Sequence, residues 1–385
     1  MHRGTTGRYE VTTTAGEAVR AFVPAPLPPV PPLELNAPHQ RLHERALLAC
    51  GRLDGLSVLL PEPTLFLYAY VRREAVLSSQ IEGTQSTLSQ LLLFELGEAP
   101  GVPFDDVVEV SNYVAAMEHG LARLREGLPL SKRLIREVHA TLLSRGRGAD
   151  KLPGEFRRSQ NWLGGTRPGN ATFVPPPPQA VEPCLDDLER FIHSDETLPV
   201  LLRAALVHLQ FETIHPFLDG NGRVGRLLIA LMLRDAGLLR QPLLYLSLYF
   251  KQHRAEYYRL LDAVRRDGDW EAWVAYCLEG VAVTAEGAVD TAQRLLALFQ
   301  ADAARLKASK APTGTLQVYD ALRARPLATI KSLAERAEVS FPTASKAIDL
   351  LTKLGITREL TGGRRNRFFA YDAYVSILNE GTEPL

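Results

Sequence analysis

His215-Pro-Phe-Leu-Asp-Gly-Asn-Gly-Arg-Val-Gly-Arg226 is the stretch of sequence that says most about this chain. Its Gly220-Asn221-Gly222 portion directly precedes an apolar, helix-like pattern that runs over residues 223–235. The unpaired backbone N–H groups and the dipole at the start of such a helix favour a bound anion. The stretch therefore predicts a helix N-terminus that cradles phosphate.

The charged residues of this stretch fit the same chemistry. Arg223 and Arg226 are three residues apart, so both are expected near one face of the first helical turn, where they can pair with phosphate oxygens. Asp219 offers hard oxygen ligands for Mg²⁺. His215 is a side chain that titrates near neutral pH, as a general base requires. Together they predict a phosphate-transfer centre, and a simple helix-entry loop beside a core histidine is the alternative.

The stretch matches the pattern HxFx(D/E)GNGRxxR at every defined position, and the chain resembles the Fic (filamentation induced by cAMP) family over roughly residues 8–290. The resemblance implies AMPylation, in which a Tyr, Thr or Ser hydroxyl of a target protein attacks the α-phosphate of ATP and pyrophosphate leaves. ATP would then be the substrate and Mg²⁺ the metal cofactor. Gly222 fits AMP transfer, because the related Doc group has lysine at this position and acts as a kinase.

The resemblance also implies a role for each residue of the site. His215 would be the catalytic base, Phe217 would anchor the loop in the core, and Asp219 would hold Mg²⁺. Gln252 and Tyr258 fall in a segment that resembles the one beside adenine. The complete expected ATP-binding set is Glu82, His215, Gly220, Asn221, Gly222, Arg223, Val224, Gly225, Arg226, Gln252 and Tyr258.

An upstream segment, Ser78-Ser-Gln-Ile-Glu-Gly83, matches the (S/T)xxxE(G/N) inhibitory motif of the same family. Ser78 and Glu82 are one helical turn apart, and Gly83 permits a close backbone approach. The resemblance implies that Glu82 inhibits by pairing with Arg226, within one chain or across a dimer. The alternative is a solvated glutamate on a helix surface.

Residues 161–174 interrupt the helical pattern with turn chemistry at their centre, which predicts a short hairpin. By resemblance this hairpin is the flap that holds the target's modified segment by strand addition. An ordinary surface hairpin is the alternative. The expected docking residues are Thr166, Arg167, Pro168, Gly169 and Asn170.

Apolar residues recur at helical spacing from about residue 40 to 281, which predicts a mainly α fold. The helical spans are 46–60, 71–96, 107–125, 131–143, 184–194 and 199–214. The proline-rich residues 24–38 predict an extended segment on the core, with a PxxP signalling ligand less favoured. We expect an N-terminal Fic-associated region over 1–110, a catalytic core over 111–290, a helical linker over 291–312 and a separate unit over 313–385.

The C-terminal unit resembles a winged helix-turn-helix. Helical patterns at 316–323, 330–337 and 341–354 precede two strand-like runs around residues 362–365. Arg364, Arg365 and Arg367 would lie at the wing and be available for DNA phosphates. Such domains also bind proteins, so DNA and protein partners both remain open.

The composition sets further expectations. The 385 residues carry a formal net charge of zero, so nothing global indicates a nucleic-acid or membrane partner. Cys50, Cys184 and Cys277 are widely separated, which argues against a disulfide framework or a zinc site. With no apolar leader or membrane-length stretch, we expect a cytoplasmic protein.

The favoured function is therefore an autoinhibited protein adenylyltransferase that acts on a target protein, which can be the chain itself, and we expect it to form a homodimer. One alternative is an enzyme that removes AMP while Glu82 is engaged. Another is a nucleotide-sensing transcriptional regulator that works through the winged helix. The intact His215 argues against pure sensing, because binding phosphate requires no general base.

Overall fold

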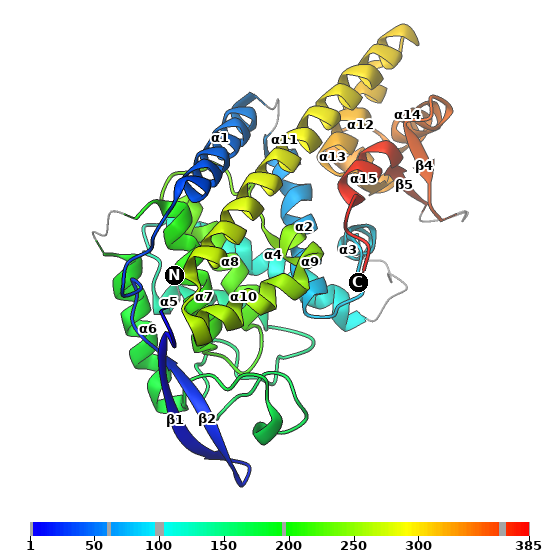
Figure 1. Ribbon diagram of the computed structural model, residues 1–385. Helices are drawn as coiled ribbons and strands as arrows, with labels where there is room; N and C mark the ends of the chain where they lie inside the picture. Colours follow the sequence, from blue (N-terminus) through cyan, green and yellow to red (C-terminus); the bar gives the residue numbers. More distant parts are fainter. Residues whose placement is uncertain (1–2, 60–62, 97–103, 195–197, 362–366, 385) are drawn as a thin grey trace.

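The computed structural model describes residues 3–59, 63–96, 104–194, 198–361 and 367–384 (Figure 1). The predicted mainly α fold is confirmed. The helices of the N-terminal and central region are α1 (Ala37–Leu59), α2 (Pro63–Ile81), α3 (Leu88–Glu95), α4 (Phe104–Arg125), α5 (Lys132–Leu142), α6 (Pro178–Ile192), α7 (Val200–Ile214), α8 (Asn221–Asp235), α9 (Ser247–Gln252), α10 (Arg254–Asp267) and α11 (Trp270–Ala308).

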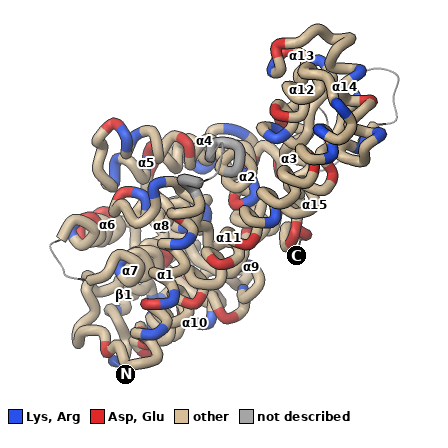
Figure 2. The backbone as a smooth tube through the Cα atoms, turned by 90° about the horizontal axis from the view of Figure 1, so that it is seen from above, with Lys and Arg blue, Asp and Glu red and all other residues tan. Residues whose placement is uncertain are grey.

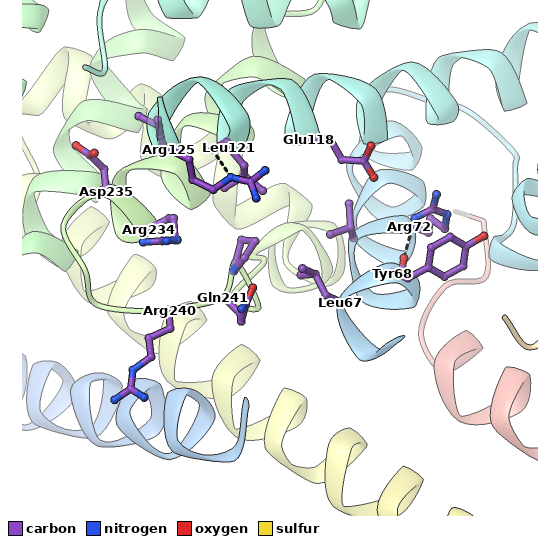
Figure 3. A pocket seen from close by; sticks show the side chains of 13 residues that line it. Leu67, Tyr68, Arg72, Glu118, Leu121, Arg125, Arg234, Asp235, Arg240 and Gln241 are labelled. Atoms are coloured by element: carbon purple, nitrogen blue, oxygen red, sulfur yellow. Dashed lines mark hydrogen bonds between the residues drawn. The ribbon is translucent and has the colours of Figure 1, made fainter. Parts of the chain in front are cut away.

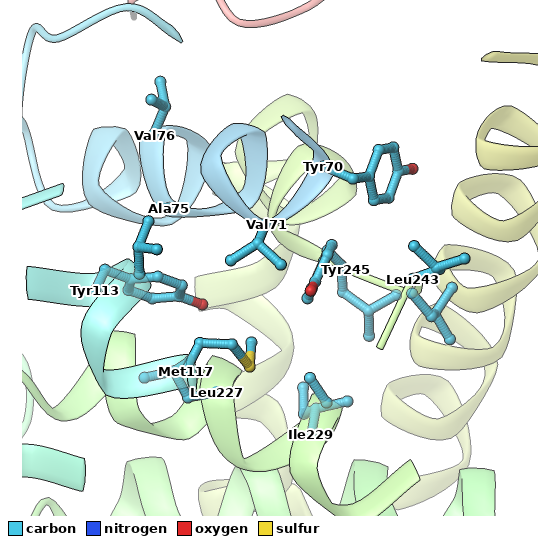
Figure 4. Packing of buried hydrophobic residues seen from close by; sticks show 14 of the residues in the cluster. Tyr70, Val71, Ala75, Val76, Tyr113, Met117, Leu227, Ile229, Leu243 and Tyr245 are labelled. Carbon is cyan, nitrogen blue, oxygen red and sulfur yellow. The ribbon is translucent and has the colours of Figure 1, made fainter. Parts of the chain in front are cut away.

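Helix α8 lies at the centre of the bundle, and nearly all of its side chains are buried. It packs against α4, α5 and α7, while α2 crosses α4 and α9. Figure 4 shows apolar side chains from α2, α4 and α8 meeting in this core, among them Val71, Met117 and Leu227. This packing fixes the N-terminal end of α8, where the phosphate cradle was predicted, relative to the end of α2.

The single helical span predicted over 71–96 is wrong, because the structure divides it into two helices. Helix α2 ends at Ile81, and Gly83 follows in the left-handed region with φ of 101°. Thr87 then starts α3 with a capping box closed by Gln90. Apolar spacing continues through the break because both helices bury residues in the same core, so periodicity alone does not reveal it. Glu82 lies in this break.

An N-terminal hairpin that the sequence analysis missed consists of β1 (Gly7–Thr14) and β2 (Glu17–Pro24). Its two-residue turn, Ala15-Gly16, has positive φ at both positions, as a type I′ turn requires. The Phe22 N–H donates to the Val174 carbonyl at 2.9 Å, so β2 lies against the end of the predicted flap.

The predicted flap hairpin contains a single antiparallel bridge between Leu163 and Phe173, with the short 3₁₀ turn η1 (Pro168–Asn170) between them. The proline-rich segment has no helix or strand over residues 25–36, and Leu27, Leu33 and Leu35 pack on the core. The prediction of an extended segment is confirmed.

The C-terminal region packs near the far end of the long helix α11 (Figure 1). Its elements are α12 (Thr313–Ala324), β3 (Leu327–Thr329), α13 (Ile330–Arg336), α14 (Phe341–Lys353), β4 (Thr357–Glu359), β5 (Phe368–Tyr371) and α15 (Asp372–Asn379). The strands form an antiparallel sheet in the order β3-β5-β4. Helix α11 runs without a break through the predicted boundary at residue 290.

One wing residue falls within the described residues. Arg367 forms a partly exposed ion pair with Glu359 at 2.7 Å, and its availability for DNA phosphates stays a prediction. Arg364 and Arg365 lie outside the described residues. Basic and acidic residues are interspersed over the described chain (Figure 2). Within it, no helix is both long and apolar enough to cross a membrane.

Candidate active site

His215 caps the C-terminal end of α7 in the left-handed conformation, with φ of 49°. The buried guanidinium of Arg157 holds this position. Its Nε donates to the His215 carbonyl at 2.8 Å, and its Nη2 donates to the Ile214 and Pro176 carbonyls. A cation at this helix end also complements the helix dipole. Arg157 therefore belongs to the site, although sequence analysis missed it.

The expectation of a near-neutral pKa for His215 is wrong. Burial, reinforced by the nearby cations Arg157 and Arg265, lowers the pKa of His215 to about 4. The imidazole is thus neutral at physiological pH. A neutral imidazole is the form that can accept a proton from a hydroxyl.

Phe217 anchors the loop in the core, as predicted, because its side chain is fully buried. Its ring stacks on His139, with ring centroids 3.6 Å apart and an angle of 4° between the planes. The side chain of Asn221 accepts from the Phe217 N–H and donates to the Phe217 carbonyl, both at 2.9 Å. The Asn221 side chain therefore shapes the loop, which leaves its backbone N–H for an anion.

His139 of α5 is a second residue that sequence analysis missed. Its Nδ1 accepts from the Gly154 N–H at 2.8 Å, so its Nε2 carries the proton and donates to the Asp219 carbonyl at 3.0 Å. Burial lowers the pKa of His139 to about 4, which keeps this neutral tautomer. The available signal was a histidine on the apolar face of the predicted helix 131–143, where a polar side chain needs partners.

The predicted cradle is present at the start of α8. Gly220 precedes the helix with φ of 78°, and the first backbone bond joins the Val224 N–H to the Gly220 carbonyl at 3.0 Å. The N–H groups of residues 221–223 therefore lie outside the helix's own hydrogen bonds. Val224 is buried in the core, and Gly225 lies against Glu212 of α7, so these two predicted ATP-binding positions serve helix packing.

Asp219 borders the cradle. Its Oδ1 accepts from the Gly220 N–H at 2.6 Å and from Arg223 at 3.3 Å, while Oδ2 faces Gly148, which has no side chain to cover it. Its side chain is 33% exposed. No cluster of three or more His, Cys, Asp or Glu side chains in the described residues could hold a metal ion alone. A lone carboxylate beside a phosphate cradle nevertheless fits Mg²⁺, which usually takes one or two carboxylates plus phosphate oxygens.

The prediction that the Arg223 side chain emerges beside that of Arg226 is wrong. Its side chain is only 1% exposed and forms an ion pair with Glu109 of α4 at 2.8 Å. Burial raises the pKa of Glu109 even though Arg223 opposes this shift. Arg223 thus has a local counter-ion inside the protein, and it ties α8 to α4 as well as to Asp219.

Arg226 lies against the predicted inhibitory motif. Its Nε donates to the Ser78 hydroxyl at 2.8 Å, and one terminal nitrogen donates to the Ser78 carbonyl at 3.0 Å and to Glu82 Oε1 at 2.7 Å. Gly83 ends α2 beside them. The structure therefore brings Ser78 and Glu82 to Arg226. Gly83 is exposed with open space around it, so the expected close backbone approach at Gly83 is wrong, and its positive φ is what favours glycine there.

The Glu82 carboxylate lies directly over the cradle. A Cβ placed on Gly222 would come within 2.3 Å of Glu82 Oε1, so glycine is required for this approach. Burial alone raises the pKa of Glu82, but the charge and hydrogen bond of Arg226 outweigh it and the net shift is downward. A carboxylate therefore lies beside the start of α8, held there by Arg226.

The flap is braced at both ends. Asn161 donates to the Phe217 carbonyl at 2.9 Å, which joins the flap to the catalytic loop. At the tip, the Asn170 side chain accepts from the N–H groups of Thr166 and Arg167 at 3.0 Å. Arg167 also pairs with Glu17, at the start of β2, at 2.5 Å.

The two predicted adenine-side residues differ in their surroundings. Tyr258 is 45% exposed, and its phenol is electrostatically coupled to Glu82 and Arg226. Gln252 instead lines a cavity of about 290 Å³ between α2, α9, α11 and the chain end, which no residue of 215–226 lines.

A separate cavity of about 620 Å³ lies between α2, α4 and the C-terminal end of α8 (Figure 3). Arg234 and Asp235 reach it from the end of α8 opposite Gly222, roughly 18 Å along the helix axis. Acidic Glu118 and Asp235 accompany its arginines, and Arg72 is already paired with Glu95. This cavity is therefore distinct from the candidate site.

The fold and site together define a helical protein in which the start of α8, with backbone N–H groups outside the helix's own hydrogen bonds, lies beside His215 and Arg226. Residues 40–122 match the Fic/DOC family N-terminal model, and residues 129–233 match the Fic/DOC family model. The first segment contains Glu82 and the second contains the entire 215–226 loop. Both segments of the chain are therefore similar to the Fic/DOC family.

Curated relatives agree with this assignment. The chain is 32% identical over 201 residues to "Protein adenylyltransferase Fic" of Drosophila melanogaster, a match that covers 51% of this chain and 37% of the relative. It is 31% identical over 248 residues to the protein of the same name from Drosophila grimshawi, covering 62% and 47%. The matches thus span less than half of either relative's length.

Two solved structures share the fold. A Fic family protein from Desulfovibrio desulfuricans G20 aligns with a TM-score of 0.61 and 20% identity, covering 88% of this chain and 97% of the other. A Fic domain containing signaling protein from Bacteroides thetaiotaomicron VPI-5482 aligns with a TM-score of 0.51 and 20% identity, covering 67% and 97%.

Proposed function

We propose that this protein is an adenylyltransferase that moves AMP from ATP to a hydroxyl of a target protein and is held inactive by Glu82. The observation that carries the proposal is the Glu82–Arg226 pair over the cradle at Gly222, next to a neutral His215. The names of the Drosophila relatives support the same reaction.

In the proposed reaction the triphosphate binds the free N–H groups at the start of α8 and the Arg226 guanidinium. The target hydroxyl attacks the α-phosphorus, the bond to the pyrophosphate oxygen breaks, and His215 takes the hydroxyl proton. The site lowers the activation barrier in two ways: it positions the phosphates for attack, and its hydrogen-bond donors neutralise their charge. Mg²⁺ on Asp219 would supply further charge neutralisation to the phosphate oxygens.

Arg223 acts differently from Arg226 in this proposal. Because Glu109 already neutralises it, Arg223 holds Asp219 and the cradle in place and adds little net charge toward ATP. The flap residues 166–170 would receive the target segment, with Glu17 and Asn161 fixing the flap's tip and base.

Inhibition follows from competition between two anions for one place. Glu82 holds Arg226 by a charge-assisted hydrogen bond and lies over Gly222, so ATP must displace it or bind with its phosphates turned. A misplacement of about 1 Å costs on the order of 10²-fold in rate.

The test is Glu82→Gly at equal concentrations of ATP carrying a labelled α-phosphate. We expect AMP labelling of the protein and of cell-extract proteins to rise by about 10²-fold. Adding His215→Ala or Arg226→Ala to Glu82→Gly should abolish that gain. Labelling equal to or below wild type in Glu82→Gly would contradict autoinhibition and favour AMP removal instead.

The target protein, DNA binding by the C-terminal region, homodimer formation and a cytoplasmic location stay predictions. Phe341, at the start of α14, is 56% exposed, and Arg367 is paired with Glu359. These two features favour a protein partner for this region over DNA.

A further inference from the structure

The last residues of the chain contact the segment that carries Glu82, some 300 positions earlier in the sequence. Gln80 of α2 donates to the Ser86 carbonyl at 2.9 Å and to the Thr382 carbonyl at 2.8 Å. One amide group therefore closes the 81–86 turn and attaches it to the C-terminal tail, residues 380–384. Gln80 is 1% exposed and Thr382 is 2% exposed, so solvent does not replace these bonds.

A buried lysine reinforces the same attachment. The Lys251 ammonium donates to Gln80 Oε1 at 2.7 Å, and it also contacts the Gly381 and Glu383 carbonyls. Lys251 is 6% exposed, and burial lowers its pKa. A buried cation needs these oxygen partners, so removing the tail would leave the ammonium with Gln80 alone.

Further contacts attach the tail and Asn379, the last residue of α15, to α2, α11 and α3. Arg73 of α2 donates to the Glu380 carbonyl at 2.7 Å, while the Glu380 carboxylate pairs with Arg294 of α11. Asn379 donates to the Ser89 hydroxyl of α3 at 3.1 Å. The tail and Asn379 therefore contact residues before Glu82, on α2, and after it, on α3. Helix α15, which packs against both of these helices, positions the tail there (Figure 1).

We propose that the C-terminal tail is a clamp that holds the 81–86 turn, and hence Glu82, over the nucleotide site. The proposal rests on Glu82 being inhibitory. Because the tail continues directly from α15 of the C-terminal region, a partner that pulls on this region would loosen the clamp and free Arg226 for ATP. In this proposal the C-terminal region responds to the partner, and AMP transfer at the nucleotide site increases as a result.

Two variants test the clamp in the full chain. Removing residues 380–385 deletes its partners, and Lys251→Met removes the ammonium while keeping the apolar stem. Each should raise AMP labelling by roughly 5- to 30-fold, the factor that follows from losing one or two hydrogen bonds. Arg45→Gln removes an exposed ion pair between α1 and α11 that does not involve the tail, and it should leave labelling unchanged.

The Glu82→Gly background separates this proposal from the proposed function. With the carboxylate gone, the tail variants should add nothing further, because there is no inhibitor left to release. If Glu82→Gly activates but neither tail variant does, the clamp is wrong while autoinhibition stands. A tail variant that activates equally with and without Glu82 also overturns the clamp.

Hydrogen exchange provides a readout that does not depend on activity. The Glu82, Gly83 and Thr84 N–H groups donate to the Ser79 and Gln80 carbonyls at the end of α2. These amides should exchange about 5- to 30-fold faster in Lys251→Met than in wild type, whereas amides within α8 should not change. Unchanged exchange over residues 82–84 would refute the clamp.

Discussion

At the residue scale, the site depends on histidines that the fold keeps neutral. His215 is partly buried near Arg157 and Arg265, and His139 has both ring nitrogens bonded to backbone groups. In the proposed function a neutral imidazole is the base at the first position, and at the second it is a fixed donor. Both residues are histidines, and only their different surroundings give them different roles.

The lowered pKa of His215 predicts an unusual pH profile for Glu82→Gly. A base that titrates at about 4 remains unprotonated from pH 8 down to about 5, whereas an ordinary histidine would be mostly protonated below 6.5. Loss of Glu82 lowers this pKa further, because its negative charge raises it. We expect kcat/KM to show no acid limb between pH 6 and 7. A limb centred near 6.5 would contradict this assignment.

The contacts of His139 predict that it positions Asp219. In the Glu82→Gly background, His139→Phe keeps a ring against Phe217 but leaves the Asp219 carbonyl without its donor. We expect kcat/KM to fall about 10²-fold, together with a higher Mg²⁺ requirement. His208→Phe is the matched control, because His208 is equally buried but bonds Tyr257. An unchanged Mg²⁺ dependence in His139→Phe would assign that residue a packing role only.

At the element scale, the break between α2 and α3 is what brings Glu82 to Arg226. A continuous helix over 71–96 would keep residue 82 within a helical turn, with no exit at Gly83 and no cap at Thr87. The left-handed Gly83 and the Thr87–Gln90 capping box instead stop one helix and start the next. Glu82 is thereby placed at a helix end that faces the start of α8.

The cap on α3 gives a direct stability prediction. Thr87→Ala removes the side chain that accepts from the Gln90 N–H, and such a loss costs about 1 kcal/mol of unfolding free energy. Urea denaturation should show the corresponding shift in midpoint. Thr141→Ala is the control, because its hydroxyl bonds only the Glu137 carbonyl within α5 and its loss should be nearly neutral. Equal shifts in both variants would argue against a capping role.

At the scale of the whole molecule, α11 connects the helical region that resembles the Fic/DOC family to the C-terminal region. The Tyr371 hydroxyl donates to the buried Asp302 carboxylate at 2.5 Å, and the Tyr319 hydroxyl donates to the Phe299 carbonyl at 3.2 Å. Both acceptors lie on α11. The attachment is therefore a specific buried polar contact within a shared apolar core.

Tyr371→Phe should weaken that attachment. It leaves Asp302, which is 2% exposed, without its tyrosine donor, at a cost of about 1–3 kcal/mol. We expect the C-terminal region to unfold at a lower temperature than in the wild type. Hydrogen exchange measured at increasing temperature would detect this change. Tyr374→Phe is the matched control, because its hydroxyl has no recorded hydrogen bond in the described part of the chain. Unaltered unfolding of Tyr371→Phe would mean that packing alone holds the two parts together.

The sequence by itself determined the elements whose cause is local. Helical spacing predicted most helices, and the Gly220-Asn221-Gly222 spacing predicted the cradle at the start of α8. In both cases the physical reason lies within a few residues, in helical periodicity or in the backbone freedom at a helix start. The motif at 78–83 predicted which glutamate reaches Arg226 only through the family resemblance, because the two residues are 144 positions apart.

Only the tertiary structure decided what depends on partners distant in sequence. The low pKa of His215 comes from burial and from Arg157 and Arg265, and the engagement of Arg223 comes from Glu109 on another helix. The tail's contact with Gln80 joins residues about 300 positions apart. No local pattern encodes such pairings, because burial and charge neighbours exist only after the chain has packed.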